Sequence, residues 1–251
     1  MMNIKAATKY QLNEYIKSVR IFYLVVILVT LFFGGIVNFG DSSNVNMMGG
    51  TEMSTAIFLF VLGLNSFKET FLMMLQNSTT RKTMFVSRLI AVLATGVSMA
   101  IIDRFIISFA KLFTYVNENY QVSGMYEMVF QNRAESLHTV IMNLEAILIT
   151  IGVYIAAIIA GYFITTAYYR MNKILKVAVS VGVPVTLFFL LPIIDMSVYD
   201  GKISRAIGKL FAFVFGGESG NPYNLLISCL LFSVVGIGLS WLLIRKAVEK
   251  N

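Results

Sequence analysis

The residue types that most often carry out catalysis are scarce in this sequence. It has one histidine, His138, and one cysteine, Cys229, among 251 residues. Neither has a partner at the spacing that binds a metal or activates a nucleophile. The nearest fragment to a phosphate-binding loop, Gly208-Lys209, is followed by Leu210 and lacks the upstream glycine of that motif. We therefore expect no catalytic residues, no metal and no cofactor in this chain, and no hydrolysis of ATP by the chain alone.

Three ionisable residues remain inside or beside apolar segments: Asp103, Arg104 and Glu145. The first two follow Arg88 by about 15 residues, or about 22 Å along a helix, which predicts a place in the outer part of a bilayer. Charges at that depth need a partner or water. They can pair with other helices, line an outward vestibule on a substrate path, or mark the membrane interface. Glu145 has the same alternatives.

The composition indicates a membrane protein. Hydrophobic residues make up 57% of the chain and charged residues 13%, whereas a globular chain carries roughly 25% charged residues. Only helices and closed barrels satisfy their backbone groups in lipid, and the alternation of a barrel strand is absent. The fold class is therefore predicted to be all-α and polytopic, with six transmembrane helices. The apolar segments that predict them cover 21–39, 53–64, 85–102, 141–169, 177–194 and 225–244.

The basic residues predict the topology. Short cytoplasmic loops are enriched in lysine and arginine, and 14 of the 20 basic residues fall on one side if both termini are cytoplasmic. This arrangement explains the net charge of +7 without a nucleic-acid partner. The residues on the inner side are Lys5, Lys9, Lys17, Arg20, Lys68, Arg81, Lys82, Arg88, Arg170, Lys173, Lys176, Arg245, Lys246 and Lys250.

The whole chain, 1–251, is predicted to be a single transmembrane permease domain. Residues 1–20 carry apolar side chains at helical spacing, which predicts an interfacial amphipathic helix on the inner membrane surface. Proline removes a backbone donor, so Pro184 and Pro192 predict a kinked or broken fifth span. An outer insertion, 195–222, precedes the last span and contains a segment that is basic on one side and apolar on the other, as in a surface or re-entrant helix.

The loop between the second and third spans, within 66–88, is the most informative part of the sequence. Apolar residues recur at helical spacing from 67 to 75, so the second span is predicted to continue as a helix to Gln76. Asn77 tolerates the left-handed conformation that ends helices. Ser78 or Thr79 can then cap a new helix. The result is a short, basic elbow, parallel to the membrane on the cytoplasmic side.

This elbow resembles the coupling helix of ABC-2 type exporter permeases, where a stretch close to Leu-x-x-Gly-x-Ser/Thr-Arg-Lys-x-x-Phe follows the second span. Here the stretch runs from Leu75 to Phe85, with Asn77 where the family often has glycine. The amphipathic N-terminal helix, the six spans and the outer insertion also recur in that family. The resemblance implies that the residues contacting an ATPase are Asn77, Ser78, Thr79, Thr80, Arg81, Lys82 and Phe85.

The resemblance further implies the partners. Two separate ABC ATPase subunits would bind ATP and Mg, and a second permease subunit, identical or a close paralogue, would complete the assembly in the lipid bilayer. The chain would then be a multi-pass protein of the cell membrane, as in a bacterial plasma membrane. It would export an amphipathic or hydrophobic substrate, with peptide as the first choice and drugs or lipids as alternatives.

Three simpler interpretations stand beside this one. The pair Arg81 and Lys82 also obeys the positive-inside rule without any coupling role. A non-transporting membrane partner, such as an immunity or sensor subunit, needs no ATPase. An ion-driven carrier normally shows duplicated halves and ionisable residues at mid-membrane, and the sequence displays neither plainly.

Overall fold

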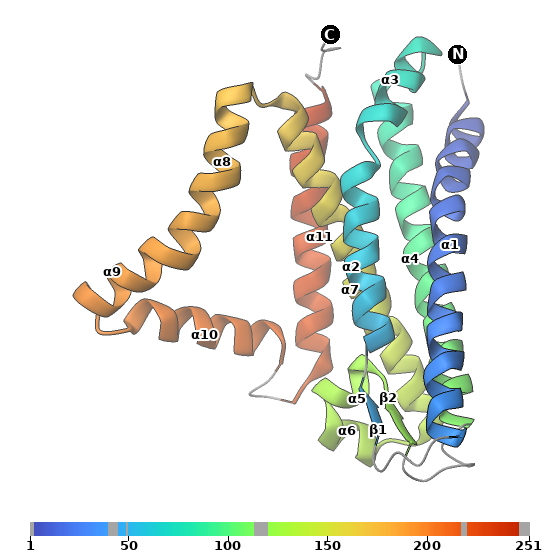
Figure 1. The fold of residues 1–251 in the computed structure, drawn as a ribbon. Coiled ribbons are helices and arrows are strands. Elements are labelled where there is room, and N and C mark those ends of the chain that lie inside the picture. The colour runs from blue at the N-terminus through green and yellow to red at the C-terminus, as the bar shows by residue number, and fades with distance from the viewer. Residues whose placement is uncertain (1–2, 40–44, 49, 113–119, 217–219, 246–251) are drawn as a thin grey trace.

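The computed structural model describes residues 3–39, 45–48, 50–112, 120–216 and 220–245. Figure 1 shows an upright bundle of long helices, with a bent arm of shorter helices beside it. The most extensive contacts join α7 to α2 and to α11, and join α1 to α4. The bundle helices are α1 (Ile4–Phe39), α2 (Gly50–Asn65), α4 (Arg81–Ala110), α7 (Thr139–Arg170) and α11 (Pro222–Arg245).

Within the described residues, six helical segments are long and apolar enough to cross a membrane. Five include the bundle helices, and the sixth is the arm segment Lys173–Val198. The prediction of a helical, polytopic membrane protein is therefore confirmed. The described ends of the chain, in α1 and α11, lie at the same end of the bundle in Figure 1. Which end faces the cytoplasm stays a prediction.

The first helix corrects the expectation for residues 1–20. The helix α1 runs from Ile4 to Phe39 without interruption, so the structure shows no separate interfacial helix. Its 36 residues are about 54 Å long, well beyond the roughly 30 Å of hydrocarbon in a bilayer. The apolar face that was expected to rest on lipid packs on the protein instead, because Tyr15 is buried in the main core and Leu12 and Val19 pack against that core.

The second span is also broken where continuity was predicted. The helix α2 ends at Asn65, and α3 (Lys68–Gln76) starts after a two-residue interruption. The hydroxyl of Ser66 donates to the carbonyl of Gly63 at 2.8 Å at this point. The predicted end of the helix at Gln76 is confirmed. We call the turn from 77 to 80, with the adjoining ends of α3 and α4, the hairpin, and its end of the molecule the hairpin end.

The fifth span leaves the bundle as the arm (Figure 1). It consists of α8 (Lys173–Val185), the π-helical turn η2 (Thr186–Leu190) and α9 (Leu191–Val198). Pro184 lies inside α8 and Pro192 lies at the start of α9, so the predicted distortion is confirmed. The helix α10 (Lys202–Val214) then runs back toward α11, as Figure 1 shows, and confirms that the segment 195–222 contains a helix.

The opposite end of the bundle carries a cap of short elements, and we call it the capped end. Two strands, β1 (Val45–Met48) and β2 (Tyr120–Ser123), pair in parallel. The helices α5 (Met125–Val129) and α6 (Gln131–Ser136) follow. These two four-residue strands are formed by segments outside the apolar runs and accompany an otherwise helical fold. Their backbone groups find each other across about 75 residues of sequence, which no local pattern predicts.

Among the described residues, buried apolar side chains form three clusters. The main core includes Leu59, Met99 and Ile158 of α2, α4 and α7. A second cluster lies at the hairpin end and includes Phe71 and Phe85. A third, which contains Tyr126, lies beneath the cap. The cores at the two ends fix the hairpin and the cap to the same rigid helices.

Candidate functional site

The hairpin differs in its local geometry from the predicted elbow. Asn77 ends α3 with a negative φ, so it is not in the left-handed conformation. Ser78 is the residue with positive φ, at 53°. Thr80 caps the next helix, since its hydroxyl accepts from the Thr83 amide at 3.2 Å. The expectation of a left-handed Asn77 and a cap at Ser78 or Thr79 was therefore wrong by one or two positions. Because α4 starts at Arg81 and continues through the bundle, no separate helix parallel to the membrane forms.

The seven predicted coupling residues divide into two groups. Asn77, Ser78, Thr80 and Lys82 are exposed on the hairpin. The others serve the fold: Thr79 is 5% exposed, and the Phe85 ring packs against Trp241 with 5.1 Å between ring centres. The Arg81 guanidinium donates to the backbone carbonyl of Arg245 at 2.7 Å, which ties the hairpin to the end of α11. An external partner that binds here meets the first group.

A buried polar network lies directly beneath the hairpin, and the sequence did not single it out. Arg88 is 2% exposed, and one of its terminal nitrogens lies 3.7 Å from the Glu14 carboxylate. The Thr70 hydroxyl donates to the same carboxylate at 2.8 Å. The guanidinium also lies over the Tyr15 ring, 5.1 Å from its centre. The network therefore joins α1, α3 and α4, so a displacement of the hairpin acts on α1 as well.

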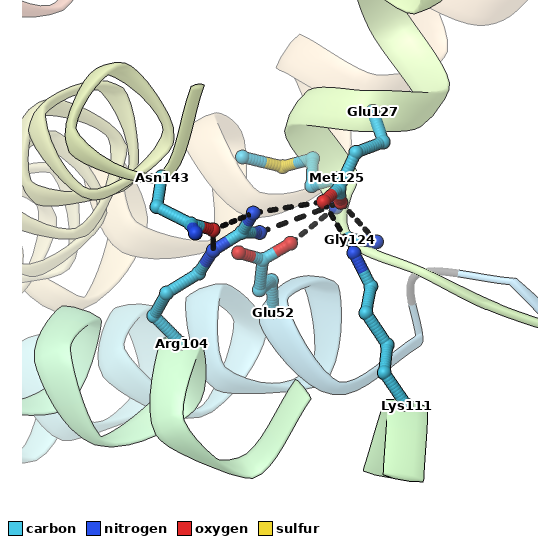
Figure 2. Close-up of polar contacts among 7 residues, drawn as sticks. All are labelled: Glu52, Arg104, Lys111, Gly124, Met125, Glu127 and Asn143. Carbon is cyan, nitrogen blue, oxygen red and sulfur yellow. Dashed lines mark hydrogen bonds and ion pairs between the residues drawn. The ribbon is translucent and has the colours of Figure 1, made fainter. Parts of the chain in front are cut away.

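At the capped end, the side chain of Arg104 is at the centre of a second polar network (Figure 2). It donates to Glu127 Oε1 at 2.8 Å and to Asn143 Oδ1 at 2.8 Å. The Lys111 ammonium donates to the same Glu127 oxygen at 2.8 Å. The Glu52 carboxylate accepts the backbone N–H of Met125. These contacts hold the cap, through α5, on α2, α4 and α7.

Opposing effects set the pKa of Glu127. Burial raises it, but the hydrogen bonds and charges of Arg104 and Lys111 outweigh burial and lower the pKa to about 2. The amide of Gly124 also donates to this carboxylate, at 2.5 Å. A side chain at Gly124 would collide with Glu127 and lie 3.0 Å from Arg104, so glycine lets the carboxylate reach the backbone. Glu127 is thus ionised throughout the physiological range.

The three predicted path residues have separate partners. Asp103 is fully buried and accepts from the hydroxyls of Tyr23 and Tyr154. Arg104 belongs to the network of Glu127. The structure therefore pairs Asp103 and Arg104 with other elements, one of the alternatives that the sequence left open. Since they are 0% and 5% exposed, neither side chain opens onto a passage in this conformation.

Glu145 belongs to a third group, at the junction of the cap with α11. The Arg133 guanidinium donates to it at 2.7 Å, and the hydroxyls of Tyr126 and Tyr223 donate at 2.7 and 2.8 Å. Burial and then the hydrogen bond to Glu145 raise the pKa of Tyr126 to about 12. The hydrogen bond to Glu145 raises the pKa of Arg133. Both residues thus keep their protons at physiological pH, and Glu145 anchors the cap.

The described residues offer little for a metal or a nucleophile. Among them no group of three or more His, Cys, Asp or Glu side chains is arranged to hold a metal ion. His138 Nδ1 accepts the amide of Val140 at 3.4 Å at the start of α7, so its imidazole caps a helix.

Comparison of the chain with protein-family models, curated proteins and solved structures found no match. The fold alone defines the class: a helical protein with six helices able to cross a membrane, within the residues that the structure describes.

The depressed pKa of Glu127 predicts acid sensitivity of the cap. A carboxyl whose pKa falls from 4.5 to about 2 on folding stabilises the fold above pH 4.5, and this contribution is lost as the pH falls toward 2. Solvent screens part of it, so we expect on the order of 2 kcal/mol. Unfolding in detergent should therefore be easier at about pH 3 than at neutral pH. In Glu127→Gln this pH dependence should shrink.

Glu135→Gln is the matched control, because Glu135 is an exposed acid of the same cap. Its acid sensitivity should equal that of the wild type. An unchanged pH dependence in Glu127→Gln would show that the ion pairs of the cap contribute nothing to stability.

Proposed function

We propose that this chain is the membrane-spanning subunit of an ATP-driven exporter, in which separate ATPase subunits act on the hairpin. The observation that carries the proposal is the exposed, basic turn between the second and third spans, at the end of the bundle where α1 begins and α11 ends (Figure 1). Asn77, Ser78, Thr80 and Lys82 offer hydrogen-bond donors, acceptors and one cation to a partner there.

The course of α4 supports a mechanical role for the hairpin. This helix has 30 residues, about 45 Å, and bears the hairpin at one end and Asp103 and Arg104 near the other. If this helix moves as a rigid body, a displacement at its hairpin end reaches its other end. Beneath the hairpin, Arg88 and Glu14 attach α1 to the same motion. A displacement of the hairpin would thereby move the end of α4 that lies under the cap.

The remaining parts of the proposal follow from the resemblance to ABC-2 permeases. ATP and Mg would bind only in the partner ATPases, and a second permease subunit would complete the pathway in the cell membrane. The cargo would be amphipathic or hydrophobic, with peptide as the first choice. The bulky apolar side chains of the arm, such as Phe188 and Phe189, are exposed and would face lipid, cargo or the second subunit.

The cleanest test is charge reversal at Lys82. This side chain is exposed on the hairpin, so Lys82→Glu should leave the fold intact and repel an acidic contact on an ATPase. The chain should be purified from membranes of its own source, and the ATP hydrolysis that accompanies it should be measured. We expect this activity to fall at least tenfold in Lys82→Glu, with unchanged amounts of inserted protein.

Lys173→Glu is the matched control, because Lys173 is an exposed lysine at the same end of the bundle, at the start of α8. It should keep the wild-type activity. A thiol placed at Thr80 should also be inaccessible to impermeant reagents in intact cells. Labelling from outside, or no ATP hydrolysis in any preparation, would refute the exporter and favour a non-transporting partner.

An ion-driven carrier is the second candidate, and the buried carboxyl of Asp103 within a span is the observation in its favour. Transport by inverted membrane vesicles separates the two. An exporter requires ATP after collapse of the proton gradient, whereas a carrier stops when the gradient collapses.

A further inference from the structure

Asp103 has the most unusual surroundings of the buried acids in this protein. It lies on α4, is 0% exposed and faces α1 and α7. The Tyr23 hydroxyl of α1 lies 2.9 Å from its Oδ1 atom, and the Tyr154 hydroxyl of α7 contacts its Oδ2 atom. Both neighbours are neutral hydroxyls.

Other buried or half-buried acids receive stronger compensation. Glu127 and Glu145 each accept from a guanidinium group. Asp195 accepts two backbone N–H groups at the start of α10. Within the described part of the chain, Asp103 makes no ion pair and accepts no backbone N–H. An ionised carboxylate buried with hydroxyls alone is costly, and such a group is commonly neutral.

The charged groups around Asp103 leave no cation free for it. Among the described residues, the ionisable side chains that face it are Tyr23 from α1, Glu52 from α2 and Tyr154 from α7. Its neighbour on α4, Arg104, directs its guanidinium to Glu127 and Asn143, as Figure 2 shows. Around Arg104, the carboxyls of the buried Glu52 and Asp103 and of the half-buried Glu127 lie with two cations, Arg104 and Lys111. One additional proton balances the charge.

The hydrogen-bond partners around Asp103 can also accommodate that proton. Each tyrosine hydroxyl carries one hydrogen, yet Tyr23 lies 3.1 Å from the Met99 carbonyl and Tyr154 lies 3.3 Å from the Glu52 carbonyl, in addition to Asp103. If Asp103 is protonated, its O–H donates to Tyr154, and Tyr154 donates to the Glu52 carbonyl. Both tyrosine hydrogens then have an acceptor, and Asp103 carries no charge.

We propose that Asp103 is a proton-binding site, held as a neutral carboxylic acid by Tyr23 and Tyr154 at the junction of α1, α2, α4 and α7. Loss of the proton to solvent places a negative charge among these helices beside Glu52, which loosens the capped end. The bound proton thus locks the bundle below the cap. This inference concerns the chain alone and is independent of any ATPase.

Infrared spectroscopy of the purified protein in lipid nanodiscs at neutral pH tests the site. A protonated carboxyl absorbs apart from an ionised one, and growth on aspartate labelled with carbon-13 at its side-chain carboxyl shifts the bands of aspartic acids alone. We expect one protonated aspartic acid band in the wild type. Asp103→Asn should lose this band, and Asp195→Asn should keep it.

The wild-type spectrum keeps the test valid if Asp103→Asn fails to fold, because the isotope shift needs no variant. Tyr154→Phe should move the band, since it removes the hydrogen-bond partner of the acid. Absence of a labelled band at neutral pH would overturn the proposal, as would a band that persists in a folded Asp103→Asn protein.

Discussion

Replacing Arg104 by methionine is expected to lower the free energy of unfolding by about 3 kcal/mol, because it leaves the Glu127 carboxylate with only the more exposed Lys111 as its cation. The Arg104 side chain is 6% exposed and that of Glu127 is 14% exposed, so water cannot replace the lost partner easily. The Asn143 side-chain oxygen would also lose the hydrogen bond that it accepts from Arg104 at 2.8 Å. The removal of one side chain thus leaves unsatisfied groups on both α5 and α7.

Unfolding in mixed detergent, followed by helical circular dichroism, measures this loss. Lys111→Met is the control, since Lys111 contacts the same carboxylate but its side chain is 37% exposed. It should cost about 1 kcal/mol or less. The double variant Arg104→Met/Glu127→Gln should lose less free energy of unfolding than the sum of the two single variants, because each single variant leaves the other residue without this ion-pair partner. Equal effects of Arg104→Met and Lys111→Met would contradict the central place of Arg104.

The helices of this fold could be predicted because membrane solvation dominates the sequence. Long apolar segments must be helical in lipid, and each predicted segment is a helix. The distortion of the fifth span could likewise be predicted from local sequence, since Pro184 and Pro192 each lack the backbone N–H that a regular helix needs. What the pattern cannot distinguish is lipid from protein as the neighbour of an apolar face. Residues 1–20 were therefore assigned to the membrane surface, although Tyr15 is 1% exposed within the core.

The partners of the predicted polar residues could not be found from the sequence. Arg104 meets Asn143, 39 positions away, and Tyr23 meets Asp103 across 80 positions. Contacts at such separations depend on how helices pack, and a glutamate such as Glu127, in a polar loop, looks like any solvated acid. Within the hairpin, Phe85 matched the exporter pattern by type, but its ring lies in the core against Trp241.

The close contact between α2 and α7 was not predicted from the sequence either. On α7, a side chain at Gly152 would crowd Leu226 of α11. The closer approach is elsewhere. A Cβ atom at Gly161 would lie nearer than 3.0 Å to the carbonyl oxygen of Phe60, and one at Gly63 equally near to that of Ile158. Both obstacles are backbone, which cannot rotate away.

Gly161→Ala is therefore expected to force α2 and α7 apart and to destabilise the protein by about 3 kcal/mol, at the upper end of the cost of overpacking. Gly238→Ala is the control. Gly238 lies in α11, and a Cβ atom there meets nothing within 4 Å, so alanine should be neutral or stabilise by up to about 1 kcal/mol. Unfolding in mixed detergent compares the two variants directly.

The double variant gives the sharper result. If Gly63→Ala and Gly161→Ala act through the same separation of α2 from α7, the displacement that accommodates one methyl group also accommodates the other. Their combined cost should then fall short of the sum by about 1 kcal/mol or more. Additive costs would mean that each helix yields locally, and the two glycines would not define a common contact. Because α7 carries Tyr154 and Asn143 to the capped end, a separation at this contact should also weaken the hold of the bundle on Asp103 and Arg104.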